Sequence, residues 1–408
     1  MPIHKLLLPA LLLSSLVLAS NTRKVHAQAM HDPQTNPPQT NPPGANAQEV
    51  HEFIFQPGST SFPESHASTI VELNGGKPQN GDLMAAWFGG TRERDPDVAI
   101  WGARHVNGKW TAPVELVREK NIACWNPVLF HTRDGRLWLY YKFGPSPSGW
   151  SAGRRYSQDE GETWSPVEHL PAGLLGPIRA KPLVLPDGTI VSGSSVEAYD
   201  TWAAWIERSI DNGRTWAGIG PITVPSALDV PDPRLEGVHA GYDDSVPQAP
   251  DSTTVYKTKI YPPAKTTIGI IQPTIVPLGG THLRLYARSH SRSARIAVAD
   301  SFDLGSTWTQ ARFLDLPNPN SGIDAVRLRD GRIVLIYNNS STTRTPLNLA
   351  VSADGEHFRM FKTLESTAGQ FSYPAIIQSS DGSLRITYTW QRKTIKYVRL
   401  PLDQVPRR

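Results

Sequence analysis

The sequence contains only one cysteine, Cys124, so the chain cannot form an internal disulfide. This residue stands beside Trp125 in a strand-like run, and we expect it to be buried by packing rather than to act as a nucleophile. The net positive charge is also small: +4 is spread over 408 residues without a basic run, which argues against nucleic acid as a partner. Because the sequence has no Cys/His cluster and no HExxH motif, it gives no support for a transition-metal site, and we expect no cofactor.

Hydrophobic runs long enough to cross a bilayer are missing too. The longest apolar stretch, Leu6–Ala19, has only about 14 residues and is interrupted by Pro9, whereas a spanning helix needs about 20. With Lys5 before it and Val25–Ala27 as a small-residue cleavage site after it, residues 1–27 are typical of a signal peptide. We therefore expect export to the periplasm or the extracellular space, with no stable membrane insertion after cleavage.

Long helical periodicity is absent from the rest of the chain. Apolar and aromatic residues instead alternate with polar ones, as in Leu283–Arg288 and Leu384–Trp390, which predicts that strands dominate. With 39% apolar residues, a chain of this length can bury a large core. Residues 28–50, which contain the doublet QTNPPQTNPP, lack the apolar content to fold and are predicted to be a disordered linker.

A tight turn ending in glycine recurs along the chain at intervals of about 50 residues, with one longer interval of about 90, which indicates a repeated unit. The six turn glycines are Gly81, Gly135, Gly188, Gly280, Gly331 and Gly382. An octapeptide, Ser-x-Asp-x-Gly-x-x-Trp, follows most of these turns, with full copies starting at Ser157, Ser209 and Ser301 and a copy one residue shorter starting at Ser352. Asp, Ser and Gly at these offsets suit a hairpin turn, and the aromatic residue suits packing between sheets.

The octapeptide resembles the Asp box of sialidases, also called the bacterial neuraminidase repeat. The pattern predicts an all-β fold, a six-bladed β-propeller over residues 51–402 with Asp-box turns. The last glycine turn leaves room for about two more strands, so Glu52–Gln56 is expected to supply the missing outer strand and close the ring. The long interval holds an insertion at about 222–268, which is expected to form a loop on one face.

When the repeats are aligned on their glycine turns, a polar residue precedes the Pro or Ala that opens each first strand. These six residues are His66, Asn126, Lys181, Gln272, Asp324 and Tyr373. The first strand of each propeller blade is innermost, so the six side chains should surround one mouth of the central channel. Packing alone would favour similar apolar residues here, and we interpret the set as a functional ring. The alternative is a water-filled channel lined by soluble residues.

The resemblance to the sialidase superfamily extends over roughly residues 52–400, with bacterial sialidase-like sequences most similar in SHASTIVEL, AAWFGGTRERDPDVAIW, NPNSGIDAVRLRDG and SYPAIIQSSDG. Sialidases use an arginine triad on the substrate carboxylate, a tyrosine nucleophile assisted by a glutamate, and an aspartate acid/base; they are an exception to the two-carboxylate glycosidases. The resemblance implies that Tyr373 is the nucleophile and that Arg288 and Arg344 are the second and third arginines. Two converging guanidinium groups are suited to a carboxylate ligand.

The sequence departs from the sialidase pattern at two positions. The first triad arginine is expected where Ser65-His66-Ala67 stands, and the glutamate partner is expected near Gln272, which cannot act as a base. Glu197 is a possible substitute for that glutamate. His66 is interpreted as an acid/base, because a free imidazole titrates near neutrality.

The loop GGTRERDPDV supplies the remaining candidates. Asp95 and Asp97 both qualify as the catalytic acid, and Arg92 and Arg94 would restore the missing positive charge. The alternative for this loop is a charged surface turn.

These residues predict an exported, exo-acting glycoside hydrolase, of the exo-α-sialidase type, that cleaves a terminal acidic sugar, either sialic acid or a uronate, from a glycan. Lys181, Gln272, Asn126 and Asp324 would line its pocket together with the arginines. Three alternatives stay open: a uronate-directed lyase using a His/Tyr pair, a non-catalytic glycan-binding propeller, and a protein-interaction propeller with its contact surface at 222–268.

Overall fold

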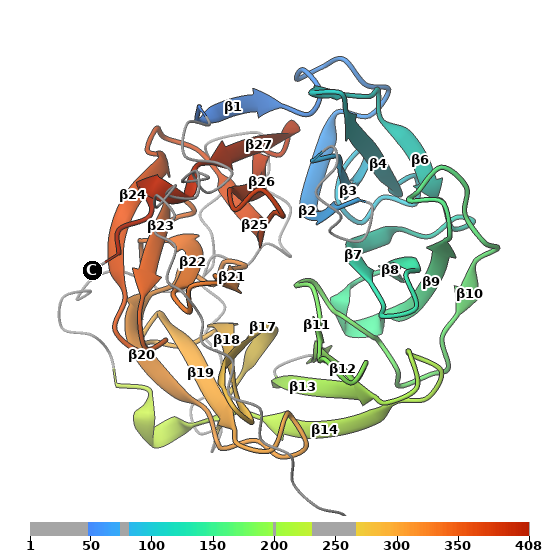
Figure 1. Ribbon diagram of the computed structural model, residues 1–408. Coiled ribbons are helices and arrows are strands. Elements are labelled where there is room, and N and C mark those ends of the chain that lie inside the picture. Colours follow the sequence, from blue (N-terminus) through green and yellow to red (C-terminus); the bar gives the residue numbers. More distant parts are fainter. Residues whose placement is uncertain (1–47, 74–80, 199–200, 231–266, 408) are drawn as a thin grey trace, which may run out of the picture. The chain divides into compact units, whose positions relative to one another are not determined.

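The computed structural model describes residues 48–73, 81–198, 201–230 and 267–407. Within them, antiparallel strands form six sheets arranged around a central axis as the blades of a propeller (Figure 1). The prediction of an all-β, six-bladed propeller is confirmed. The predicted signal peptide at 1–27, the linker up to residue 47 and most of the insertion at 222–268 lie outside the described residues.

Each blade begins with its innermost strand, as expected. Blade 1 contains β2 (Glu64–Glu72), β3 (Leu83–Gly90), β4 (Ala99–Val106), β5 (Lys109–Trp110) and β6 (Val114–Val117). Blade 2 contains β7 (Cys124–His131), β8 (Leu137–Phe143), β9 (Ser151–Ser157) and β10 (Glu168–His169). Blade 3 contains β11 (Leu183–Val184), β12 (Ile190–Ala198), β13 (Thr201–Ser209) and β14 (Ala217–Ile222).

The second half of the chain repeats this pattern. Blade 4 contains β17 (Ile270–Gly279), β18 (His282–Ser289), β19 (Arg295–Ser301) and β20 (Arg312–Pro317). Blade 5 contains β21 (Asp324–Arg327), β22 (Ile333–Asn338), β23 (Leu347–Ser352) and β24 (Arg359–Glu365). Blade 6 contains β25 (Phe371–Gln378), β26 (Leu384–Trp390), β27 (Thr394–Leu400) and, as its outer strand, β1 (Val50–Phe53).

Strand β1 closes the ring. It pairs antiparallel with β27 from Val50 opposite Arg399 to Phe53 opposite Lys396. The sequence predicted this outer strand at Glu52–Gln56, and the observed strand begins two residues earlier. Closure of this kind removes the exposed strand edge that an open sheet would present.

Short elements connect the blades. A two-stranded ladder, β15 (Val224–Pro225) with β16 (Thr267–Ile268), joins the two ends of the predicted insertion. Within the described residues, short 3₁₀ helices lie at Pro147–Gly149, Ser226–Leu228 and Leu402–Gln404. No helix in the described part of the chain is both long and apolar enough to cross a membrane.

The hydrophobic core lies between neighbouring blades. One cluster joins Met84 of blade 1 to Leu137 of blade 2, and another joins Val334 of blade 5 to Ile386 of blade 6. Cys124 is fully buried in the first cluster, as predicted, and burial raises the pKa of its thiol to about 12, which keeps it protonated at neutral pH.

The four Asp boxes form hairpin turns held by their own side chains. In blade 3, Ser209 Oγ accepts a hydrogen bond from the Gly213 amide at 2.8 Å, and Asp211 accepts one from the Thr215 amide at 2.9 Å. These hydrogen bonds, the Thr215 amide first, lower the pKa of Asp211 to about 2. The boxes that start at Ser157, Ser301 and Ser352 repeat the arrangement. The six turn glycines all have positive φ, as the tight turns require.

The alternation of strand direction separates two ends of the propeller. The glycine turns after the first strands and the Asp boxes after the third strands lie at one end, called here the Asp-box end. The starts of the first strands and the loops between second and third strands lie at the other, called the mouth end. Every residue that the sequence nominated for catalysis or substrate binding belongs to the mouth end.

Candidate active site

Three arginines surround the ring of Tyr373 at the mouth end, and we call this group the arginine cluster. The guanidinium carbons of Arg179, Arg288 and Arg344 lie 5.4, 5.8 and 5.5 Å from the centre of that ring. All four side chains are buried. Arg288 Nη1 donates a hydrogen bond of 2.8 Å to the Tyr373 hydroxyl. The structure therefore brings together Tyr373, Arg288 and Arg344, which the sequence nominated from separate blades.

Asn320, in the loop before β21, holds two of these arginines. Its side-chain oxygen accepts a hydrogen bond from Arg288 Nε at 2.9 Å, and its backbone oxygen accepts one from Arg344 Nη2 at 3.2 Å. Asn320 adopts φ +54, a left-handed conformation that asparagine tolerates. This bend places both acceptors toward the guanidinium groups and fixes their orientation.

Arg179 is the member of the cluster that sequence reasoning missed. It stands before β11 and donates from Nη1 to the Ile323 oxygen at 2.8 Å and from Nη2 to the Pro374 oxygen. Its guanidinium group lies against the tyrosine ring, and its hydrogen bonds tie the backbone next to Tyr373 to the loop before blade 3. The third positive charge near Tyr373 is thus supplied by Arg179. The expectation assigned this charge to Arg92 or Arg94, but Arg92 is exposed and pairs with Asp95 at 3.2 Å.

A buried lysine supports the segment that carries Arg179. Lys142 on β8 donates to the Pro177 oxygen at 2.8 Å, and burial lowers the pKa of its ammonium group to about 7. Lys142 pairs with Trp125 just before the bulge of blade 2, as Arg288 pairs with Ile271 just before the bulge of blade 4. The two cations therefore occupy equivalent positions in their blades.

The predicted ring is displaced by one residue in blade 1. In blades 2, 4 and 6 a β-bulge holds Asn126, Gln272 and Tyr373 at positive φ, but the equivalent residue in blade 1 is Ala67 and not His66. The alignment of His66 with this ring is therefore wrong. Proline follows the left-handed residue in the other three bulges. In blade 1 serine stands at that position, so the sequence there lacks the proline that marks where the bulge lies. Bulges of this kind redirect side chains next to functional sites.

His66 nevertheless reaches the cluster. Its ring centre is 4.2 Å from that of Tyr373, and its Nδ1 lies 3.1 Å from Thr389 Oγ1. Burial lowers the pKa of His66 well below its usual value, and the charges of the surrounding arginines lower it further. The near-neutral titration expected from a free imidazole is therefore wrong for this site. The imidazole beside the phenol is therefore neutral, and its lowered pKa makes it a weak base.

Gln272 connects the cluster to Glu197. Its side-chain oxygen accepts from Arg288 Nη1 at 3.3 Å, and its amide nitrogen donates to Glu197 Oε1 at 3.3 Å. Ser195 donates to the same carboxylate oxygen at 3.0 Å. Burial raises the pKa of Glu197. The carboxylate is thus linked to Tyr373 through Gln272 and Arg288, and no hydrogen bond among the described residues joins it to the phenol directly.

Two further ring residues pair with each other. Lys181 Nζ lies 2.8 Å from Asp324 Oδ2, which joins blade 3 to blade 5 across the channel. Asp324 also accepts hydrogen bonds from Thr274 Oγ1 at 2.7 Å and from the Ile376 amide at 2.9 Å. These contacts hold the inner strands of several blades together. Asn126 is buried in the bulge of β7, and no hydrogen bond between described residues links it to Tyr373 or Arg288.

The loop between β3 and β4 carries the candidate acids at the mouth end. Asp97 Oδ2 accepts hydrogen bonds from both the amide and the hydroxyl of Thr91, each at 2.9 Å. This carboxylate therefore stabilises the loop that carries it. The described partner of the Asp95 carboxylate is the exposed Arg92. Asp95 is therefore freer than Asp97 to turn toward a ligand, while Arg94 has the unusual φ of +81.

Comparison with known proteins identifies the family. Residues 81–386 match the model of the BNR repeat-like domain, which covers most of the chain. The chain belongs to this family. No curated protein matches it.

Solved structures with the same fold include sialidases and a protein of unknown function. The latter, from Dyadobacter fermentans, has 14% identity over 88% of this chain and 99% of its own, with a TM-score of 0.64. A Hadza microbial sialidase has 15% identity, covers 88% of this chain and 69% of its own, and has a TM-score of 0.65. A mutant of the NanB sialidase of Streptococcus pneumoniae has 12% identity over 90% and 72%, with a TM-score of 0.63. The BNR-repeat chain therefore has a sialidase-like propeller fold.

Proposed function

We propose that this protein is an exported glycoside hydrolase that removes a terminal acidic sugar, a sialic acid or a uronate, from a glycan. The observation that supports it is the convergence of Arg179, Arg288 and Arg344 on Tyr373. Guanidinium groups bind carboxylates through paired, charge-assisted hydrogen bonds, and their strength increases in a buried site. Export is proposed from the composition of residues 1–27.

Each residue has a role in the proposed reaction. Arg288 and Arg344 bind the sugar carboxylate, and Arg179 holds the backbone beside Tyr373 through Pro374. The Tyr373 oxygen attacks the anomeric carbon while Asp95 protonates the departing glycosidic oxygen. A phenol is a weak nucleophile at neutral pH, so it needs a base and cations. Glu197, whose pKa burial raises, accepts the phenol proton through a water molecule, and Arg288 stabilises the developing phenolate. Water then releases the sugar from Tyr373.

A second candidate function is elimination from a uronate. The packing of a neutral His66 on Tyr373, next to arginines, favours it. In this reaction the arginines neutralise the carboxylate and so acidify the proton α to it. Tyr373, ionised with the help of Arg288, removes this proton and passes it to the departing oxygen, while His66 lies against the tyrosine ring. The product carries a double bond in place of the cleaved linkage and gains no water.

One experiment separates these reactions. The protein is incubated with sialosides, uronate-capped oligosaccharides and the same compounds with the carboxylate reduced to an alcohol. Hydrolysis adds one water to the product mass, whereas elimination produces ultraviolet absorbance without that addition. We expect turnover only where the carboxylate is intact. Arg288→Ala should reduce kcat/KM about 10- to 150-fold, from the loss of about 1.5–3 kcal/mol of charged hydrogen bonding.

The exposed Arg327 provides a matched control for the arginine variant. Arg327→Ala removes the same side chain from β21, outside the arginine cluster, and should leave kcat/KM unchanged. Equal turnover of the intact and reduced substrates, or equal rates for the two arginine variants, would contradict the proposal. Saturable binding without any product would favour the non-catalytic glycan-binding alternative.

A further inference from the structure

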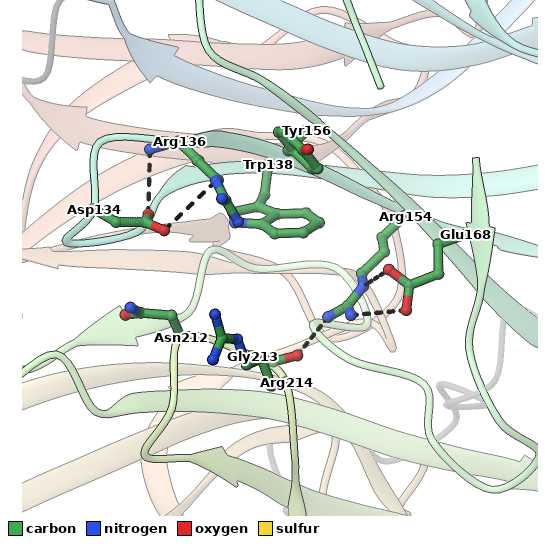
Figure 2. A pocket seen from close by; sticks show the side chains of 9 residues that line it. All are labelled: Asp134, Arg136, Trp138, Arg154, Tyr156, Glu168, Asn212, Gly213 and Arg214. Carbon is green, nitrogen blue, oxygen red and sulfur yellow. Dashed lines mark hydrogen bonds and ion pairs between the residues drawn. The ribbon is translucent and has the colours of Figure 1, made fainter. Parts of the chain in front are cut away.

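A cavity lies at the Asp-box end, between blades 2 and 3, and we call it the rim pocket (Figure 2). Its volume is about 220 Å³, below the range of drug-sized ligand pockets and suited to a small ligand. Arg136, Trp138 and Arg154 line it from blade 2, and Arg214 lines it from the Asp box of blade 3. Because the arginine cluster is at the mouth end, the rim pocket is separate from the candidate active site.

The repeated fold provides an internal comparison for Arg214. In blades 2 and 5 the residue after the Asp-box glycine is a glutamate that accepts hydrogen bonds from arginine. Glu162 accepts from Arg104 of blade 1 at 3.0 Å. Glu356 accepts from Arg284 of blade 4 at 2.5 Å and from Arg312 at 2.7 Å. At these two junctions the chain itself places a carboxylate opposite the arginines of the preceding blade.

The junction between blades 2 and 3 has the opposite charge at that position. Arg214 follows Gly213, and its guanidinium makes no hydrogen bond or ion pair with the residues that the structure describes; Figure 2 shows it beside the pocket. Arg154 pairs with Glu168 through two hydrogen bonds of 2.9 Å and also donates to the Gly213 oxygen. The pocket therefore contains three arginines and only two carboxylates, those of Asp134 and Glu168.

Aromatic rings hold two of these arginines in place. Arg154 lies over the ring of Trp138 at 4.9 Å, and Arg136 lies over the ring of Tyr156 at 4.7 Å. Cation–π contacts of this kind orient a guanidinium group. Glu168 and Gly213 accept hydrogen bonds from Arg154, and Arg136 Nε lies 3.6 Å from Asp134. The pocket thus places oriented guanidinium groups beside aromatic rings. The guanidinium groups suit the carboxylate of an acidic sugar, and the apolar ring surface suits the carbon face of that sugar.

We propose that the rim pocket binds a carboxylate-bearing sugar residue, whose carboxylate supplies the negative charge that Glu162 and Glu356 supply at the other two junctions. Arg214 is its main partner, and Arg136 is a second. This site would hold a glycan segment away from the reacting sugar. The proposal depends on the rim pocket alone and stands whether or not Tyr373 is catalytic.

The test is an NMR titration of the full chain with sodium D-glucuronate, observed at the indole N–H of Trp138. Trp138→Phe assigns the signal. We expect a saturable shift with glucuronate and none with D-glucose. Arg214→Glu rebuilds the carboxylate arrangement of the other junctions, so it should weaken binding at least about tenfold. Arg133→Glu makes the same charge change in a neighbouring exposed turn and should bind like the natural chain.

Three results would overturn the proposal: the same titration curve for Arg214→Glu as for the natural chain, an equal response to glucose, or an equal response to sodium sulfate. The sulfate result would show a site for anions in general and not for an acidic sugar. The Arg288→Ala variant tests whether the Trp138 response depends on the candidate active site. The Trp138 response should persist in that variant, and its loss would place the glucuronate in the arginine cluster instead.

Discussion

Nη1 of Arg288 lies 2.8 Å from the hydroxyl oxygen of Tyr373, and this hydrogen bond joins blade 4 to blade 6 across the mouth of the propeller. The two residues are 85 positions apart in the sequence. Because the phenol oxygen faces a guanidinium group, a negative charge that develops on that oxygen during reaction is stabilised where it forms.

Tyr373→Phe removes only that oxygen. We expect it to reduce kcat on the responsive acidic glycan at least about 100-fold, because neither a nucleophile nor a proton donor remains on the ring. The matched control is Tyr337→Phe on β22, where another buried phenol is removed from a different blade. Steady-state kinetics should show near-natural kcat for the control. Similar rates for both variants would exclude Tyr373 from the chemistry.

Asp95→Asn and Asp97→Asn test which aspartate is the acid. Asp97 accepts two hydrogen bonds from Thr91, so its amide variant should lower the melting temperature of the protein while leaving turnover per folded molecule largely intact. Asp95→Asn should instead abolish most turnover of substrates with poor leaving groups and spare those with good ones. Kinetics with both substrate types, together with calorimetry, would show whether the roles are reversed.

His66 should make folding sensitive to acid. Its folded-state pKa is well below the unfolded value of about 6.5, so the unfolded chain binds the proton first as pH falls. Its contribution to stability is complete above about pH 6.5 and is lost below it, by up to about 1.4 kcal/mol per pH unit. Urea unfolding at pH 7.5 and 5.5 should show a smaller loss for His66→Gln. An equal loss would mean that the imidazole protonates freely in the folded protein.

Lys142 should make the stability of the folded protein depend on pH in the alkaline range. Its pKa is about 7 in the folded protein, against about 10.4 when unfolded, so stability should increase as pH rises from 7 toward 10. Lys142→Met keeps the length of the side chain without the charge and should abolish that increase. Because Lys142 also supports the Pro177 oxygen, the variant should loosen Arg179 and raise KM for the acidic glycan. Unfolding between pH 7 and 9.5 and steady-state kinetics would check both effects.

The fold could be predicted from the sequence because its signals are local and repeated. Each glycine turn and Asp box is a short motif whose hydrogen bonds form within a few residues, as those of Ser209 with Gly213 do. The pairing of Tyr373 with Arg288 could be anticipated from the resemblance to sialidases. The register of blade 1 could not, because Ser68 stands where proline follows the left-handed residue in blades 2, 4 and 6.

Arg179 could not be found from the sequence for a different reason. It lies outside the regular strands, and its importance comes from contacts with residues 144 and 195 positions away, Ile323 and Pro374. The pairing of Lys181 with Asp324 is equally remote in sequence, at 143 positions. Which of several inward polar residues pair with each other depends on distances across the channel, and a linear pattern does not contain them.

The pairing of β1 with β27 closes the ring of blades by strand pairing and without a covalent bond. The four residues of β1, near the start of the propeller sequence, pair with β27, near its end. The ring of blades therefore closes only after almost every blade has been made. During translation from the first residue, β1 must therefore stay unpaired while the other strands assemble. The arginine cluster, which draws on blades 4, 5 and 6 and on the loop before blade 3, is assembled late in the same process.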